Sequence, residues 1–200
     1  MYMKNIIFDL GGVLTIGKPY SILDNLNLDS DTYNDLKRFF EYYRELDLGN
    51  ISLEEAFNNC NFAEDIKTKY KDYVINYYKH RIFNKELFDL IKRLKMNNYK
   101  VYILSDNNRE VANYYQSYEL FKDIDGWVVS CDYGTVKRDG TLFDIILDKY
   151  NLKPEECYFI DDNEINVKVG EEHGIKGYIY SINDSIDKIY SDMRSNGISI

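Results

Sequence analysis

The sequence has 200 residues, of which 44% are hydrophobic and 30% are charged, and its formal net charge is −9 at pH 7. A chain of this length and composition can form one α/β domain, or one domain that carries a small insertion. The negative charge argues against nucleic-acid backbones and anionic membranes as partners, so an anionic substrate would need a local positive patch or a metal ion.

Cysteine usage and the first residues bear on the compartment. Cys60, Cys131 and Cys157 show no C-x-x-C spacing, which favours free thiols in a reducing compartment. The first ten residues contain one lysine and a short apolar run, too short for a signal peptide or a membrane span. We therefore expect a cytoplasmic location.

The first predicted elements are a strand and a group of helices. Residues 5–10 form an apolar run that ends at Gly11 and the glycine after it, as expected of a buried strand. From residue 18 to residue 82 the apolar residues recur at helical spacing, and Ser52 with Glu55 forms an S-x-x-E capping box. We expect a small all-helical segment here.

Beyond residue 82 the predicted strands and helices alternate. Apolar runs typical of strands occur at residues 100–104, 126–130, 157–160 and 177–180. Helical patterns occur at residues 87–96, 108–118, 142–150 and 165–173, and again after residue 184. Such alternation predicts an α/β fold with a Rossmann-like, doubly wound parallel sheet.

Polar residues follow the predicted strands at the edge where ligands bind in such sheets. They are Asp9, the run from Ser105 to Asn108, Lys137, and the pair Asp161-Asp162. Taken singly, the first three have ordinary explanations as turn, capping or solvated residues. Two adjacent carboxylates repel each other unless a positive group is near, and the joint pattern on one edge predicts a functional site.

The charges of these residues suit phosphoryl transfer. That reaction needs an in-line nucleophile, a cation to neutralise the phosphoryl oxygens, and donors that hold them. Carboxylate oxygens of Asp9 and Asp162 suit Mg²⁺, while Ser105 and Lys137 offer a hydroxyl donor and a positive charge. Attack by Asp9 on phosphorus would give an aspartyl-phosphate, from which water releases phosphate.

The motifs resemble those of the haloacid dehalogenase superfamily over essentially the whole chain. They are FDLGGVL at 8–14, LSDNN at 104–108, Lys137, and FIDDNEIN at 159–166. They look most like small phosphatase-like members whose first motif reads DLGGV. The resemblance implies a core of residues 1–17 and 83–200, with residues 18–82 as a helical cap of the C1 type inserted after the first strand.

The resemblance also implies roles for the site residues, with Mg²⁺ as cofactor and a small phosphorylated molecule as substrate. The nucleophile of such phosphatases corresponds to Asp9. Their metal ligands correspond to Asp9, the carbonyl of Gly11, and Asp162, with Asp161 as a ligand or a supporting group. Phosphate-binding roles fall on Ser105 and Lys137, and the neighbouring residues Asp106 and Asn107 are further candidates for contacts with the substrate. Asn166 stands where the fourth motif often has another Asp.

One departure from the family pattern concerns the general acid. Most phosphatases of the family carry a second Asp two residues after the nucleophile, where this chain has Gly11. General acid–base help is typically worth about 10²–10⁴ in rate, so turnover is expected to be slow unless Asp106 or Thr15 substitutes. A smaller departure is Arg138, where a proline commonly follows the lysine.

Three other functions compete with a phosphatase. A protein that binds Mg²⁺ and a phosphorylated ligand without turnover is favoured by Gly11. A dehalogenase would also lack the second Asp, but it needs no metal, which leaves the Asp161-Asp162 pair unexplained. A phospho-accepting receiver has its acidic pair at the first strand, whereas here the pair comes after a later strand.

Substrate and oligomeric state are not determined by these patterns. Specificity is expected to lie in the cap, whose polar and aromatic candidates are Tyr20, Tyr42, Tyr43, Arg44, Tyr77, His80 and Arg81.

Overall fold

The computed structural model describes residues 3–200, and its centre is a parallel sheet. Within these residues the sheet has five strands in the order β5-β4-β1-β6-β7. The strands are β1 (Asn5–Phe8), β4 (Lys100–Ser105), β5 (Gly126–Val129), β6 (Cys157–Asp161) and β7 (Lys176–Ile179). The expected doubly wound α/β fold is confirmed, and β1 lies at the point where the strand order reverses, which is where such sheets bind ligands.

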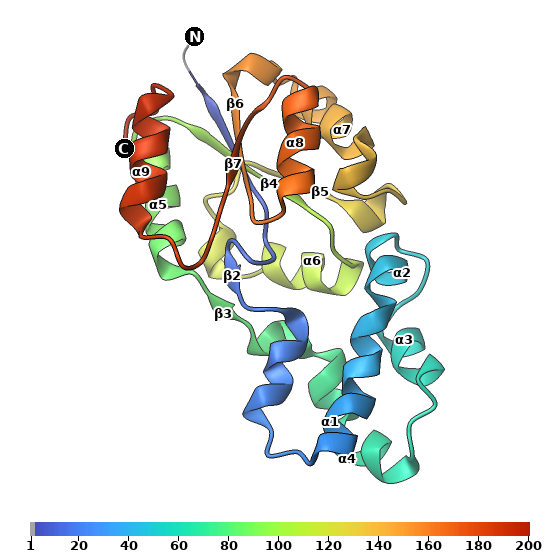
Figure 1. Ribbon diagram of the computed structural model, residues 1–200. Coiled ribbons are helices and arrows are strands. Elements are labelled where there is room, and N and C mark those ends of the chain that lie inside the picture. Colours follow the sequence, from blue (N-terminus) through green and yellow to red (C-terminus); the bar gives the residue numbers. More distant parts are fainter. Residues whose placement is uncertain (1–2) are drawn as a thin grey trace.

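Helices cover both faces of the sheet (Figure 1). One face packs on α5 (Lys85–Met96) and α9 (Ile186–Ser195), and the other packs on α7 (Thr141–Tyr150) and α8 (Glu164–Glu172). Successive strand residues point to opposite faces, so Ile6 and Phe8 of β1 enter one core and Ile7 the other. All four residues of β1 are buried, as expected of a central strand covered on both faces.

In the sequence, a run of short helices lies between β1 and β4, the next strand of the sheet. They are α1 (Ser30–Lys37), α2 (Tyr43–Asp47), α3 (Leu53–Asn59) and α4 (Glu64–Ile75), with 3-10 turns at Pro19–Asn25, Arg38–Tyr42 and Tyr77–His80. The capping box predicted at Ser52 and Glu55 is present at the start of α3. Their apolar side chains join the same core as α5 and α9, which ties the helical segment to the sheet.

Two very short strands bring the ends of this helical segment together. β2 (Thr15–Ile16) pairs antiparallel with β3 (Ile82–Phe83), an element that the sequence patterns did not predict. Figure 1 shows this pair at the junction between the sheet and the helices α1 to α4. The division of the chain into a core and a cap at residues 17/18 and 82/83 stays a prediction.

The remaining helix, α6 (Arg109–Gln116), follows β4 and faces the helical segment. Its N-cap is Asn108, whose side-chain oxygen accepts from the backbone N–H of Val111 at 3.0 Å. The same side chain donates to the hydroxyl of Tyr77 at 3.2 Å, and Tyr115 on α6 donates to the carbonyl of Tyr78 at 3.2 Å. These bonds hold the helical segment over the carboxyl ends of the strands.

Candidate active site

A buried lysine lies between two carboxylates at the carboxyl edge of the sheet. The Nζ atom of Lys137 is 2.7 Å from Oδ1 of Asp9 and 2.5 Å from Oδ2 of Asp161. The Lys137 side chain is 2% exposed and that of Asp161 is 0% exposed, so neither charge could be tolerated there alone. The three residues stabilise one another as a buried ion cluster.

Strand register explains why these residues meet. Phe8 of β1 pairs with Ile160 of β6, so Asp9 and Asp161 each follow a paired residue and lie side by side. Lys137 comes from the loop after β5, where a 3-10 turn runs from Lys137 to Asp139. Oδ1 of Asp106, at the end of β4, accepts from the backbone N–H of Lys137 at 2.9 Å and holds that loop against the sheet.

Burial and charge have opposite effects on these groups. Burial raises the pKa of Asp9 to about 7, and the Asp161 carboxylate raises it too, while the positive charge of Lys137 acts to lower it. For Lys137, burial alone would lower the pKa, but the carboxylates of Asp161, Asp9 and Asp106 raise it well above its usual range. Lys137 therefore stays charged and favours the ionised form of Asp9.

Asp161 and Asp162 are adjacent in sequence but have different surroundings. Oδ1 of Asp161 accepts from the backbone N–H of Asn163 at 2.8 Å, and its Oδ2 accepts from Nδ2 of Asn166 at 3.1 Å as well as from Lys137. Asp162 is exposed, and burial and the nearby Asp161 carboxylate raise its pKa. Asp161 thus positions the cluster, whereas Asp162 is open to the solvent side.

The carboxylates are arranged so that they could hold a metal ion. Asp9, Asp161 and Asp162 each offer an oxygen, and these oxygens lie within 4.8 Å of one another. Octahedral Mg²⁺ with ligands at about 2.1 Å places its ligand oxygens roughly 3 to 4.2 Å apart, so the set fits a hard cation after small side-chain movements. Because the oxygens of Asp161 already accept several hydrogen bonds, Asp9 and Asp162 are the better candidates for direct ligands.

The two glycines after β1 differ in what they require. Gly12 has φ of +79°, and a Cβ there would lie 2.2 Å from Oδ2 of Asp162. A side chain at Gly12 would therefore displace the Asp162 carboxylate. Gly11 does not have a positive φ, and a Cβ there would meet only Oδ2 of Asp9, at 4.0 Å. Most phosphatases of the family that the motifs resemble carry an acid at this position. Here the position is a glycine with open space around it.

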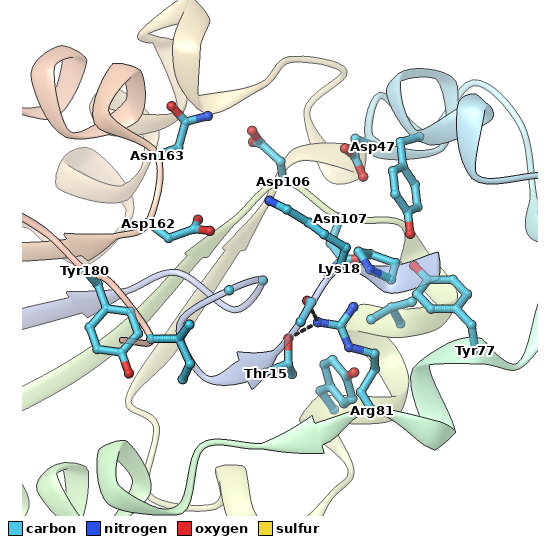
Figure 2. Close-up of a pocket in the computed structure, with 18 of the residues that line it drawn as sticks. Thr15, Lys18, Asp47, Tyr77, Arg81, Asp106, Asn107, Asp162, Asn163 and Tyr180 are labelled. Carbon is cyan, nitrogen blue, oxygen red and sulfur yellow. Dashed lines mark hydrogen bonds between the residues drawn. The ribbon is translucent and has the colours of Figure 1, made fainter. Parts of the chain in front are cut away.

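A cavity of about 770 Å³ opens above this cluster, between the strand ends and the helical segment. Figure 2 shows Asp162 and Tyr180 on one side of it and Asp47, Tyr77 and Arg81 on the other. A cavity of this volume has room for a small phosphorylated metabolite. The side walls of the cavity therefore decide which ligand can enter.

Arg81 is a buried cation in the wall of the cavity. Its Nη2 donates to Oγ1 of Thr15 and to the carbonyl of Ile16, both at 3.1 Å, and to the carbonyl of Gly17 at 2.5 Å. Its buried Nε and the buried hydroxyl of Tyr43 have no hydrogen-bond partner among residues 3–200. Unpaired buried polar atoms are costly, so both are candidates for contacts with a ligand.

Most of the sequence-predicted site residues lie at this edge, in two layers. Asp9, Ser105, Lys137 and Asp161 are buried beneath the cavity. Gly11, Asp106, Asn107 and Asp162 line it. Ser105, the last residue of β4, has its hydroxyl directed at the carbonyl of Asp106. The assignment of roles to these residues stays a prediction, developed below.

Only some of the residues expected to determine specificity lie at the cavity. Tyr43, Tyr77 and Arg81 line it, and Tyr20, Tyr42, Arg44 and His80 do not. Arg44 is exposed on α2, and its part in specificity stays a prediction. Sequence reasoning missed Asp47, the last residue of α2, which lines the cavity, because one acidic residue on a short helix gives no signal of its own.

Within residues 3–200 no helix combines the length and the hydropathy that a membrane span requires.

Comparison with known proteins identifies the family. The family model of the haloacid dehalogenase-like hydrolases matches residues 3–174, and the chain belongs to that family. Over 190 residues the chain is 26% identical to the D-ribitol-5-phosphate phosphatase of Bacteroides thetaiotaomicron. The alignment covers 88% of this chain and 91% of that protein.

Solved structures share the fold. A predicted hydrolase of this family from Porphyromonas gingivalis superposes with a TM-score of 0.72 at 25% identity and covers 97% of this chain and 99% of its own. A haloacid dehalogenase family enzyme of Bacteroides thetaiotaomicron, solved with magnesium and inorganic phosphate, gives 0.67 at 23% identity, with 94% of this chain and 99% of that chain covered. A dehalogenase with a bound intermediate gives 0.71 at 18% identity and covers 92% and 87%.

Proposed function

We propose that this protein is a Mg²⁺-dependent phosphatase that cleaves a small phosphate monoester through an aspartyl-phosphate at Asp9. The observation that carries the proposal is the cluster of Asp9, Lys137 and Asp161 beneath the cavity, with the Asp162 carboxylate free beside it. The similarity to a D-ribitol-5-phosphate phosphatase, and to a family enzyme solved with magnesium and inorganic phosphate, supports the same activity.

The geometry supports one oxygen of Asp9 as the attacking atom. Oδ1 of Asp9 is bound by Lys137, while its Oδ2 has no hydrogen-bond partner among the described residues and lies on the side of Gly11. Oδ2 is therefore the oxygen that attacks phosphorus, and Lys137 keeps the nucleophile ionised. Ser105 and Lys137 hold the phosphoryl oxygens in this proposal. When bound, Mg²⁺ would neutralise part of the phosphoryl charge, and Asp9, Asp162 and the carbonyl of Gly11 would hold it.

A panel of phosphate esters tests the proposal. Ribitol 5-phosphate, other sugar and sugar-alcohol phosphates, and p-nitrophenyl phosphate are incubated with the protein in the presence of Mg²⁺ or of EDTA. We expect phosphate release that needs Mg²⁺, and no halide release from 2-chloropropionate. Binding of phosphate and Mg²⁺ without turnover of any ester would instead support a regulatory binding protein.

The metal assignment predicts a ranking of two variants. Asp162→Asn is expected to weaken Mg²⁺ binding more than Asp161→Asn, because Asp162 is free to ligate whereas the oxygens of Asp161 already accept protein hydrogen bonds. Asp161→Asn should instead lower the melting temperature of the metal-free protein, since it removes a buried partner of Lys137. Mg²⁺ titrations monitored by thermal shift measure both effects, and the reverse ranking of affinities would overturn the assignment.

The unpaired hydroxyl of Tyr43 predicts a contact that selects the substrate. Tyr43→Phe removes only that oxygen, so the melting temperature should stay the same or rise. The KM for the best substrate should rise about 5- to 50-fold, the value of one good hydrogen bond, while p-nitrophenyl phosphate is hydrolysed as before. Tyr178→Phe is the matched control, because its buried hydroxyl is also unpaired among residues 3–200 but lies outside the cavity. Equal KM changes in the two variants would place the selective contact elsewhere.

A further inference from the structure

This chain lacks a general acid at position 11, where most phosphatases of the family carry an Asp. Gly11 has no side chain, and an alkoxide leaving group needs a proton as the P–O bond breaks. In an in-line displacement the leaving oxygen departs from the face of phosphorus opposite the nucleophile. Asp9 lies beneath the cavity, so the leaving group must lie within the cavity, towards the helical segment.

Three carboxyl groups line the cavity within the described part of the chain: Asp47, Asp106 and Asp162. Asp106 accepts a hydrogen bond from the backbone N–H of Lys137 and so holds the loop that carries Lys137. Asp162 belongs to the proposed metal site. Asp47 has no hydrogen bond or ion pair through its carboxyl group among residues 3–200, and Figure 2 shows it across the cavity from Asp162. It comes from the helical segment, on the side to which the leaving group departs.

The backbone around Asp47 is fixed against the sheet. Asp47 ends α2, and Gly49 follows with φ of +73°. A Cβ at Gly49 would lie 2.6 Å from the carbonyl of Cys131, so the chain touches the 3-10 turn Ser130–Asp132. The hydroxyl of Ser130 in that turn accepts from the backbone N–H of Asn107 at 2.9 Å, next to Asp106. These contacts therefore fix the position of Asp47 relative to the strand ends.

The surroundings of Asp47 favour its protonated form. Burial raises the pKa of Asp47 to about 8, the carboxylates of Asp106 and Asp9 raise it too, and the charge of Lys137 acts to lower it. The phenol groups of Tyr43 and Tyr77 also lie near it. A carboxylic acid that keeps its proton at neutral pH, with a pKa near the working pH, is suited to general acid catalysis.

We propose that Asp47 is the general acid of this enzyme and protonates the leaving oxygen of the substrate. This inference rests on the proposed phosphatase activity. As Oδ2 of Asp9 bonds to phosphorus, the bond from phosphorus to the leaving oxygen breaks, and that oxygen takes the proton of Asp47 to leave as an alcohol. In the second step the Asp47 carboxylate takes a proton from water, whose oxygen displaces Asp9 from phosphorus and yields phosphate.

The dependence of rate on the leaving group tests the proposal. The variant Asp47→Asn keeps the shape of the side chain but cannot release a proton. We expect the rate for alkyl phosphates to fall about 10²- to 10³-fold, and the rate for p-nitrophenyl phosphate to fall less than about 5-fold, because a phenolate of low pKa leaves without a proton. The slope of log kcat/KM against leaving-group pKa should become steeper. Glu41→Gln, an exposed carboxyl on the same helical segment, is the control and should leave the slope unchanged.

A second variant makes the result specific to the proton. Gly11→Asp in the Asp47→Asn background should flatten the slope again, since Gly11 has room for a Cβ and an acid there would reach the leaving oxygen. Equal losses for alkyl and aryl esters in Asp47→Asn would overturn the proposal in favour of a binding role. So would a steep slope in Asp106→Asn with an unchanged slope in Asp47→Asn. The two assignments can fail independently. Asp9→Asn should abolish turnover of aryl phosphates, whereas Asp47→Asn should not, so aryl phosphates distinguish a loss of the nucleophile from a loss of the acid.

Discussion

Asp9→Asn is expected to reduce phosphate release to below about one-thousandth of the wild-type rate for aryl and alkyl esters alike. An amide cannot attack phosphorus as a carboxylate does, and it is a poorer ligand for Mg²⁺. The loss should be large for every ester, because each ester needs the same nucleophile in the step that expels its leaving group. Steady-state assays across the ester panel measure it, and acid-quenched mass spectrometry should find a phosphorylated Asp9 peptide only in the wild type.

The fold of this variant should survive. Lys137 keeps its ion pair with Asp161, and burial of an amide costs less than burial of a carboxylate whose pKa is raised to about 7. We therefore expect the melting temperature to change by only a few degrees. Asp148→Asn, an exposed change of the same kind on α7, is the control and should retain full activity. Turnover above a few per cent in the Asp9 variant would mean that another group attacks phosphorus.

The strands were predictable from sequence because each central strand is buried on both faces. The predicted strands 100–104 and 157–160 are observed as Lys100–Ser105 and Cys157–Asp161. Once these strands are parallel, their carboxyl ends must share one edge, which is why Asp9 and Asp161 could be placed together. The ion pairs to Lys137 could not be predicted, since Lys137 is separated from β5 by a loop whose path depends on the bond from Asp106.

The helical segment was less predictable, for a physical reason. The apolar spacing over residues 18–82 predicted helices but not their boundaries, and the structure has α1, a 3-10 turn and α2 in succession. Its aromatic side chains, among them Phe39, Phe40 and Tyr77, pack edge to face at this 3-10 turn. Asp47 reaches the cavity through the tertiary packing of these helices, so no local pattern identifies it.

Replacement of Lys137 by methionine is expected to have the largest combined effect on activity and stability. Lys137→Met keeps an unbranched side chain that is one atom shorter, and it removes the charge that lies between Asp9 and Asp161. Removal of one partner from a buried ion cluster costs about 3–5 kcal/mol, which for a chain of this size lowers the melting temperature by roughly 10 °C. Activity should fall at least about 10³-fold, because the phosphoryl oxygens lose a positive charge and Asp9 loses the cation that keeps it ionised.

The pH dependence of this loss of stability separates an electrostatic cause from a packing defect. In the wild type the Lys137 charge acts to lower the pKa of Asp9, which burial holds at about 7, so Asp9 in the variant should bind its proton more tightly still. Asp9 is protonated in both folded proteins below about pH 7, so the stability difference should stay nearly constant there and widen as the pH rises above about 7 in EDTA. Thermal melts at several pH values measure this difference. Lys100→Met removes an exposed pair with Asp125 and serves as the control, with an expected cost below about 1 kcal/mol at every pH. A pH-independent deficit in Lys137→Met would show that Lys137 acts through packing alone, and would remove the main support for its role beside the nucleophile.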